Sequence, residues 1–264
     1  MEIFGYDIRI YFLLLMIYSV VGWCLEVLGK IIIEHKKFVN RGFLIGPYCP
    51  IYGHGAILIT VLLKKYAEDP VVLFIMTTII CGTLEYITSY LMEKIFKARW
   101  WDYSQRRFNI NGRVCLYTII PFGLLGLFIM YVSNPFLISK LEMIPENILT
   151  IVFWIVLTIY VTDYIISYTV IKYVRKTEKD FGRDLDNTEE ITEKVKDLLQ
   201  EKSPLHRRLL NAYPNFEAVK IKIKEQGKKI KKEVIEQKEE IEKKAQKVKN
   251  TVTKKMKLKN KEEK

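Results

Sequence analysis

The sequence predicts an all-α, polytopic membrane protein with about five transmembrane helices and a helical C-terminal tail. Five apolar segments approach or exceed the roughly 20 residues that a helix needs to cross a bilayer. Residues 10–15 and 148–161 contain almost no polar position, whereas a helix in the core of a soluble protein needs a polar stripe. Because the composition changes sharply near Lys172, we expect a transmembrane domain over residues 1–175 and a cytoplasmic tail over residues 176–264.

The first apolar segment is predicted to be a true span and not a cleaved signal peptide. Residues 1–9 are mixed in charge, and the apolar run that follows is longer than a signal peptide requires. The second segment is the shortest, and the turn signal at Asp69 and Pro70 begins the third. The five predicted spans cover residues 8–33, 47–63, 70–95, 114–132 and 148–173.

The basic residues of the loops predict the orientation of the chain. Short cytoplasmic loops carry an excess of Lys and Arg. We therefore expect the N-terminus outside the cell and the C-terminus in the cytoplasm of a multi-pass protein of the inner, or cell, membrane. The loops after the first and third spans hold Lys36, Lys37, Arg41, Lys97, Arg99, Arg106, Arg107 and Arg113, against Arg9, Lys64, Lys65 and Lys140 on the other side.

Residues 40–55, N-R-G-F-L-I-G-P-Y-C-P-I-Y-G-H-G, form the leading candidate for a functional site. Glycine and proline interrupt regular backbone, so this stretch predicts a broken segment at the edge of two spans. Such backbone is tolerated in a bilayer only where protein or water covers it. The residues expected to shape this stretch and its counterpart are Gly42, Gly46, Pro47, Pro50, Gly53 and Pro121.

Three acidic residues lie within the predicted spans, where an ionisable group is costly unless it faces protein or water. We expect Glu26 to pair with Arg41 and Glu85 with Arg113, or the partners to be exchanged. The pairs either line a polar pathway or only hold helices together. The full candidate site is Glu26, Asn40, Arg41, Tyr52, His54, Glu85, Asn111, Arg113 and Asp163.

An internal repeat is predicted from two similar halves of the membrane domain. The motif G-W-C-L-E at residues 22–26 is echoed by G-T-L-E at residues 82–85, and Asn40 and Pro50 are echoed by Asn111 and Pro121. Transporters commonly contain such repeats, with the binding site at the repeat interface. The alternative is coincidence among short Gly, Pro and Asn patterns.

The loop after the third span is aromatic and charged. Trp100, Trp101, Asp102 and Tyr103 predict a segment at the level of the lipid headgroups, because Trp and Tyr combine an apolar ring with a polar group. A ligand gate is the alternative. Residues 133–147 are expected to be the outer loop before the fifth span.

The tail is predicted to contain two helices. Residues 188–202 have a capping signature and one apolar face, and Pro204 and Pro214 are expected to bound a linker. Residues 216–258 form a long Lys-rich helix with a thin apolar stripe, and from Val219 onward 18 Lys oppose 8 Glu. This pattern predicts a marginal coiled coil, or a helix ordered by anionic lipid or a protein partner. A disordered tail is the alternative, and nucleic acid is disfavoured because Arg is absent beyond Arg208 and aromatic residues are absent beyond Phe216.

The sequence shows no pattern typical of catalysis. A phosphate-binding loop, a G-x-S-x-G motif and an H-E-x-x-H motif are all absent, so we expect no ATPase, no hydrolase and no cofactor. The cysteines show no C-x-x-C spacing, and we expect free thiols and no metal site. The four cysteines are Cys24, Cys49, Cys81 and Cys115.

Four motifs together resemble one family. They are G-W-C-L-E at 22–26, N-R-G-F-L-I-G-P-Y-C-P-I-Y-G at 40–53, G-T-L-E-Y at 82–86 and W-D-Y-S at 101–104. The segment from about residue 10 to 130 resembles the family called putative ABC-transporter type IV, permease-like bacterial membrane proteins. The resemblance implies a permease subunit that works with a separate ATPase. Since five spans are few for a transporter, we expect a homodimer or a larger complex. The motif positions are Glu26, Asn40, Arg41, Gly42, Gly46, Pro47, Pro50, Tyr52, Gly53, Glu85, Trp101 and Asp102.

The function predicted from these observations is therefore a permease-like component with its pathway between the two repeats. The alternative is a membrane scaffold or envelope-regulatory protein whose basic tail binds anionic lipid or a protein partner.

Overall fold

The computed structural model describes residues 2–3, 5–34, 38–96, 98–181, 188–213 and 217–218. The chain divides into two compact units, Met1–Val219 and Lys220–Lys264, and all the structure below belongs to the first. The predicted Lys-rich helix over residues 216–258 lies outside the described residues, except for residues 217 and 218.

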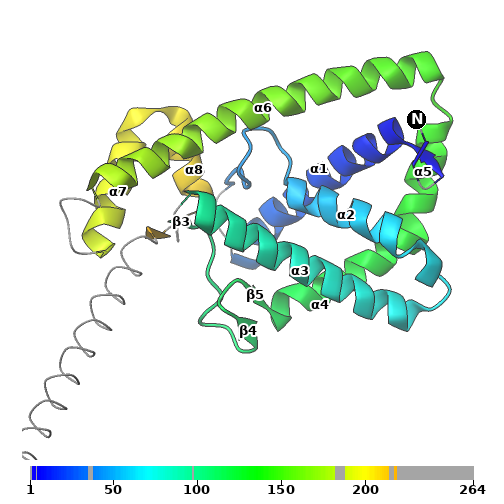
Figure 1. Cartoon of the computed structure of the whole chain (residues 1–264), viewed down its shortest axis with the longest axis horizontal. Helices are drawn as coiled ribbons and strands as arrows, with labels where there is room; N and C mark the ends of the chain where they lie inside the picture. Colours follow the sequence, from blue (N-terminus) through cyan, green and yellow to red (C-terminus); the bar gives the residue numbers. More distant parts are fainter. Residues whose placement is uncertain are drawn as a thin grey trace, which may run out of the picture. The chain divides into compact units, whose positions relative to one another are not determined.

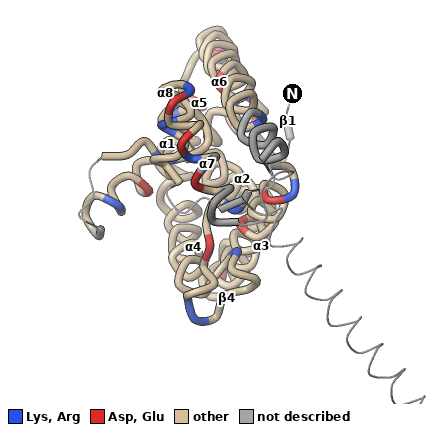
Figure 2. The backbone as a smooth tube through the Cα atoms, turned by 90° about the vertical axis from the view of Figure 1, so that its left-hand side faces the viewer, with Lys and Arg blue, Asp and Glu red and all other residues tan. Residues whose placement is uncertain are grey.

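Four helical segments in the described part of the chain are long and apolar enough to cross a membrane: Ile8–Ile32, Pro70–Ile95, Leu116–Glu142 and Glu146–Lys172. They lie in α1 (Ile8–Glu34), α3 (Pro70–Phe96), the joined helices that begin with α4 (Leu116–Phe128), and α6 (Glu146–Phe181). Figure 2 shows that these helices are largely uncharged along their length. Apolar side chains remain exposed on all of them, as expected for helices that face lipid.

The second predicted span is shorter than expected. α2 (Pro50–Leu62) has 13 residues and is followed by the 3-10 turn η1 (Lys64–Tyr66). At 1.5 Å per residue α2 is about 20 Å long, whereas the apolar layer of a bilayer is about 30 Å thick. The prediction extended this span to residue 47, but Cys49 has an extended backbone conformation and Pro50 occupies the first turn of the helix. The described residues therefore include four helices of membrane length and one shorter apolar helix.

The membrane helices pack as two pairs, with α1 against α2 and α3 against α4 (Figure 1). Glycine allows close approach in both pairs. A Cβ atom at Gly53 would lie 2.2 Å from the Leu15 carbonyl oxygen, and one at Gly123 would lie 2.4 Å from Thr78 Oγ1. Without a hydrophobic driving force between helices in lipid, such close packing stabilises helix pairs.

The fourth span continues past the residue at which the sequence predicted a loop. α4 passes through the π-helical turn η2 (Ile129–Ser133) into α5 (Asn134–Glu142). The outer loop predicted over residues 133–147 is therefore wrong over 133–142, and only residues 143–145 connect α5 to α6. Pro135 lies just after the π-helical turn, and both proline and a π-turn interrupt the regular hydrogen-bond ladder of an α-helix. The side chain of Asn134 is buried; its amide donates to Thr60 Oγ1 at 2.8 Å, and its carbonyl accepts from Tyr18 at 2.7 Å.

Three two-stranded ladders complete the first unit. β4 (Asn109–Ile110) and β5 (Val114–Cys115) form a hairpin whose turn residues Asn111 and Gly112 have φ of 54° and 66°. Positive φ at both central positions is typical of the type I′ turn, for which Asn-Gly is strongly preferred. The other two pairs are β1 (Glu2–Ile3) with β2 (Tyr6–Asp7), and β3 (Ala98–Arg99) with β6 (Glu217–Ala218).

Two short helices follow α6 and lie at its C-terminal end (Figure 1). α7 (Thr188–Lys202) covers the residues of the predicted amphipathic helix, and Val195 and Leu199 on its apolar face are buried. α8 (Pro204–Ala212) occupies the predicted linker, which is therefore helical. Pro204 begins this helix instead of interrupting it, because proline is well suited to the first helical position.

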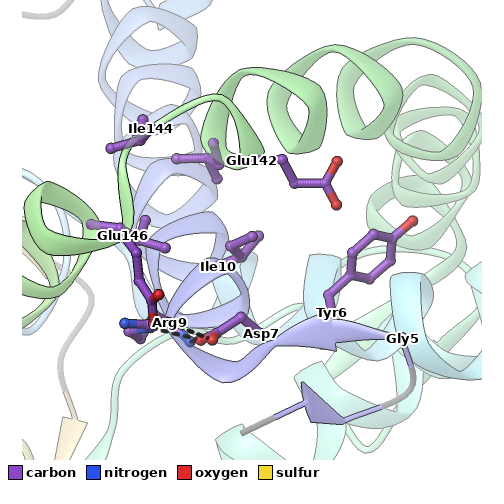
Figure 3. Close-up of a pocket in the computed structure, with 10 residues that line it drawn as sticks. Gly5, Tyr6, Asp7, Arg9, Ile10, Glu142, Ile144 and Glu146 are labelled. Carbon is purple, nitrogen blue, oxygen red and sulfur yellow. Dashed lines mark hydrogen bonds and ion pairs between the residues drawn. The ribbon is translucent and has the colours of Figure 1, made fainter.

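An ion-pair cluster lies beside the N-terminal ladder. Arg9 donates to Asp7 Oδ1 and Oδ2 at 2.9 and 2.7 Å and to Glu146 at 3.1 Å, and the cavity beside them has a volume of about 260 Å³ (Figure 3). The hydrogen bond from Arg9 lowers the pKa of Asp7 to about 2. The ion pair between Arg9 and Glu146 connects the start of α1 to the start of α6.

We expect the contribution of Asp7 to stability to vanish in acid. A carboxyl group whose pKa is lowered by folding stabilises the protein above its unfolded pKa of about 4, and this contribution is lost as the pH falls toward 2. The difference in melting temperature between the wild type and Asp7→Asn should therefore be constant above about pH 5 and shrink below it. A difference that does not change down to pH 2 would contradict the lowered pKa.

Candidate functional site

The site is built around the segment between α1 and α2, residues 38–49, which we call the return segment. The backbone N–H of Cys49 donates to the carbonyl of Ser19 at 2.8 Å. Ser19 lies about four turns before the end of α1, so the chain folds back along this helix before α2 begins. Gly42 has φ of +97°, which favours glycine and permits the turn.

Asp163 of α6 binds the backbone of the return segment. Its carboxylate accepts hydrogen bonds from the N–H groups of Ile45 at 2.9 Å and Gly46 at 2.7 Å. The hydroxyl of Tyr48 donates to the same carboxylate, and Ser167 donates from one turn further along α6 at 2.8 Å. Asp163 is only 9% exposed, so its buried carboxylate satisfies irregular backbone at the edge of a span.

Two arginines bind carbonyl groups on the other side of this junction. Arg208 of α8 donates to the carbonyl of Gly42 at 3.2 Å and also to that of Leu44. Arg41 of the return segment donates to the carbonyl of Ala212 at the end of α8. The return segment is thus connected to α8 in both directions and to α6 through Asp163.

An aromatic cluster lies between the return segment, α8 and the β3 segment. The ring of Phe43 lies 4.6 Å from that of Trp100 and 4.8 Å from that of Tyr213, and the last two are 5.2 Å apart. Trp100 is 4% exposed, so its indole contacts protein. The predicted headgroup location of residues 100–103 stays a prediction.

The predicted pair of Glu26 and Arg41 is present. Arg41 Nε lies 3.9 Å from Glu26 Oε2, and the hydroxyl of Tyr52 donates to Glu26 Oε1 at 2.7 Å. Asn40 accepts a hydrogen bond from the indole of Trp23 at 2.7 Å and donates to the carbonyl of Ile45 at 3.0 Å. With Asp163, five of the predicted residues are therefore brought together at the return segment: Glu26, Asn40, Arg41, Tyr52 and Asp163.

The predicted pair of Glu85 and Arg113 is not formed. Arg113 Nη2 lies 3.0 Å from Glu93 Oε2, and Glu93 also contacts Arg99 at 3.2 Å. Glu93 is two turns beyond Glu85 on α3 and therefore lies nearer to the hairpin that carries Arg113. Among the described residues, no arginine or lysine forms an ion pair with Glu85.

Glu85 instead accepts hydrogen bonds from two neutral hydroxyl groups. The phenol of Tyr103 and the hydroxyl of Thr118 each lie 3.4 Å from its carboxylate oxygens. The side chain is only 7% exposed. A buried carboxyl group in a membrane span is thus held without a cationic partner in the described part of the chain.

Two predicted residues lie away from these contacts. His54 is exposed on α2, where its ring lies 2.7 Å from the carbonyl of Pro50. Asn111 is exposed in the hairpin turn and donates to the hydroxyl of Tyr86 at 2.9 Å. Trp101 contributes a hydrogen bond from its indole to the carbonyl of Arg113 at 3.1 Å, and Asp102 contacts Arg99 at 3.4 Å.

The sequence reasoning missed Arg208, Glu93 and Tyr213. Arg208 had one available signal, since it is the last arginine in a chain whose later cations are all lysine. Glu93 and Tyr213 carried no signal, because each acts on residues brought near it only by folding.

The cysteines are free thiols, as predicted, and Cys49 and Cys115 are buried. Burial raises the pKa of the Cys49 thiol to about 12, so this thiol stays protonated at neutral pH. The residues that the structure describes contain no group of three His, Cys, Asp or Glu side chains that could hold a metal ion.

Replacing Arg41 should cost more stability than replacing Glu26. Arg41→Gln loses the hydrogen bond to Ala212, the contact with the Tyr213 ring and the ion pair. The ion pair itself is long and partly exposed, so its loss in Glu26→Gln should cost about 1 kcal/mol or less. The free energies of unfolding in detergent provide the comparison, and a larger loss for Glu26→Gln would contradict this order.

The double charge reversal, Glu26→Arg with Arg41→Glu, should not restore stability. A glutamate at position 41 cannot donate to the carbonyl of Ala212, whatever charge lies opposite it. If the double variant recovers the wild-type free energy of unfolding, the ion pair with Glu26 contributes more to the stability at Arg41 than the hydrogen bond to Ala212 does.

Comparison with known proteins gives one match. The family model described as "Putative ABC-transporter type IV" matches residues 13–168, which is more than half of the chain. This range includes Glu26, the return segment, Glu85 and Asp163, whereas α7 and α8 lie outside it. No curated protein and no solved structure matches the chain. The chain, with its four helices of membrane length, therefore belongs to the putative ABC-transporter type IV family of transporter-related membrane proteins.

Proposed function

We propose that this chain is the permease-like membrane component of a transport complex, energised by a separate ATPase. Its pathway runs between the helix pairs α1–α2 and α3–α4. The observation that carries this proposal is Glu85, a carboxyl group in a membrane span that is 7% exposed and has only neutral hydroxyl partners. An intramembrane ionisable residue is costly and most often serves transport or binding.

Glu26 supports the same location. It occupies the equivalent position on α1 and accepts a hydrogen bond from a tyrosine, as Glu85 does. The ring of Tyr52 on α2 also lies 5.9 Å from that of Phe122 on α4, so this hydrogen-bond donor contacts the second helix pair. A polar centre that spans the junction of both helix pairs follows from these contacts, and Tyr52 and Tyr103 supply its hydroxyl groups.

The packing of the helix pairs supports an internal repeat. In the first pair, Gly53 approaches Leu15 and Ser19, whose hydroxyl donates to the Leu15 carbonyl at 2.7 Å. In the second pair, Gly123 approaches Phe74 and Thr78, whose hydroxyl donates to the Phe74 carbonyl at 2.8 Å. Each pair thus combines a glycine with a hydroxyl side chain bonded one turn back, and inverted or parallel repeats of this kind are common in transporters. The residues that correspond are Leu15, Ser19, Glu26 and Gly53 in the first half and Phe74, Thr78, Glu85 and Gly123 in the second.

The proposal includes an orientation and partners. The N-terminus lies outside and the C-terminus in the cytoplasm, because Lys and Arg concentrate in the loops after α1 and α3. The chain acts as a homodimer or in a larger complex, performs no catalysis itself, and uses its Lys-rich tail to bind anionic lipid or a protein partner.

The proposal is tested by purifying the tagged full chain from its native membrane in mild detergent. We expect an ATPase subunit to copurify in fixed ratio. ATP hydrolysis by the complex in lipid nanodiscs should fall several-fold in Glu85→Gln and remain unchanged in the control Glu68→Gln, whose side chain is exposed in the turn before α3. Absence of an ATPase subunit, or full activity of a folded Glu85→Gln complex, would reject the permease proposal.

A scaffold or envelope-regulatory role is the second candidate, and the closed return segment favours it. Its backbone N–H groups at residues 45, 46 and 49 and its carbonyl groups at residues 42, 44 and 45 are all bound by protein. A segment so fully bonded can serve as a rigid support. If deletion of residues 220–264 abolishes the cellular function while Glu85→Gln leaves it intact, the scaffold role is favoured.

A further inference from the structure

A cavity of about 320 Å³ lies between the return segment and α8. Its lining combines two arginines and two asparagines with apolar groups, and none of the lining residues is acidic. This volume is at the lower end of the range of small-molecule sites, so it holds a group of phosphate and glycerol size. The lining residues are Phe38, Val39, Asn40, Pro204, Arg207, Arg208 and Asn211.

The arginines of the cavity retain donors for a ligand. Arg207 is exposed, and its Nε donates to the Gln200 carbonyl at 3.3 Å, which leaves its two terminal nitrogens directed to no described partner. Arg208 binds two carbonyl groups through Nη2, but its buried Nε has no hydrogen-bond partner in the described structure. Burial also lowers the pKa of Arg208, so a nearby anion would stabilise its charged form.

The position of the cavity matches the headgroup level of a bilayer. Phe38, Val39 and Asn40 follow shortly after Ile8–Ile32, the first span of membrane length. Phe38, which lines the cavity, is 64% exposed, and Ile32 near the end of α1 is 66% exposed, so both can contact an apolar chain. A ligand with an anionic head and an apolar chain would satisfy both surfaces.

We propose that this cavity binds the phosphate of an anionic phospholipid headgroup, with Arg207 as its main contact. The guanidinium forms charge-assisted and often bidentate bonds to phosphate oxygens. Asn211 supplies a further amide donor from the same helix, one turn along. The acyl chains lie along the exposed apolar end of α1. This site is separate from the Lys-rich tail and from the carboxyl groups of the proposed pathway.

The test uses the full chain in detergent and measures its melting temperature against added dioctanoyl phosphatidylglycerol, dioctanoyl phosphatidylcholine and inorganic phosphate. A ligand that binds the folded state raises the melting temperature in proportion to its affinity. We expect phosphatidylglycerol to stabilise the wild type, and Arg207→Gln to weaken its apparent affinity about tenfold. The lysines of the tail contribute the same background in every variant.

Arg107→Gln is the matched control, because Arg107 is also exposed, carries the same charge and lies outside the cavity. It should bind phosphatidylglycerol as the wild type does. Equal affinities for Arg207→Gln and Arg107→Gln would overturn the site. A different result is that inorganic phosphate stabilises the wild type with an affinity similar to that of phosphatidylglycerol, and loses this effect in Arg207→Gln. That result would overturn a lipid as the source of the phosphate. Equal stabilisation by phosphatidylcholine would overturn the requirement for a net anionic headgroup.

Discussion

Asp163→Ala should destabilise the protein by about 3–5 kcal/mol, which is the largest effect that we expect from a single side chain. The alanine leaves the N–H groups of Ile45 and Gly46, which are partly buried, without their acceptor. Each unsatisfied buried group costs about 1–3 kcal/mol. The hydroxyl groups of Tyr48 and Ser167 lose the same acceptor. The measurement is the free energy of unfolding in mixed detergent micelles.

Two variants make this result specific. Asp163→Asn keeps one carbonyl oxygen and should lose less than Asp163→Ala. Thr158→Ala, on the same helix, removes a hydroxyl that bonds only within the helix, to the carbonyl of Trp154, and should change stability by about 0.5 kcal/mol or less. If the free energy of unfolding of Asp163→Ala lies within about 1 kcal/mol of the wild-type value, Asp163 does not stabilise the return segment.

Gly53→Ala should separate α1 from α2 and cost about 2–3 kcal/mol. The added methyl group would lie 2.2 Å from the Leu15 carbonyl oxygen and 2.3 Å from Ser19 Oγ. The carbonyl oxygen belongs to the α1 backbone, so it cannot move aside without moving the helix. Overpacking of this kind typically costs about 1–3 kcal/mol and exceeds the gain in helix propensity of alanine.

Gly29→Ala is the matched control for this effect. Nothing lies within 4 Å of a Cβ atom at Gly29, so the substitution should stabilise α1 by up to about 1 kcal/mol. The two glycine variants should therefore change the free energy of unfolding in opposite directions. A stable Gly53→Ala protein would show that α1 and α2 do not pack as closely as the structure has them.

The sequence predicted the elements whose signal is local. Apolar runs located α1, α3 and α6, and the cluster of Gly and Pro located the return segment. The pairing of Glu26 with Arg41 was also predictable, because an acid inside a span needs a nearby cation and the next loop supplied one.

The remaining features depend on contacts between distant residues. Asn134 looked like the start of a loop, but Tyr18 and Thr60 satisfy its amide and allow a helix there. Arg113 was assigned to Glu85 by analogy with the first half, although Glu93 lies nearer in the folded chain. Hydrophobic periodicity carries no information about such partners.

The return segment, α6 and α8 are connected to one another by hydrogen bonds and by the chain itself. The chain runs from α6 through α7 to α8, α8 binds the return segment through Arg208, and the return segment binds Asp163 on α6 again. Because these contacts depend on one another, losing one weakens the rest. We therefore expect α8 and residues 42–49 to unfold together as one cooperative unit. In native-state hydrogen exchange, the amides of Ile45 and Gly46 should then exchange with the same opening free energy as those of α8. Unfolding of α8 would thereby expose the loop between α1 and α2.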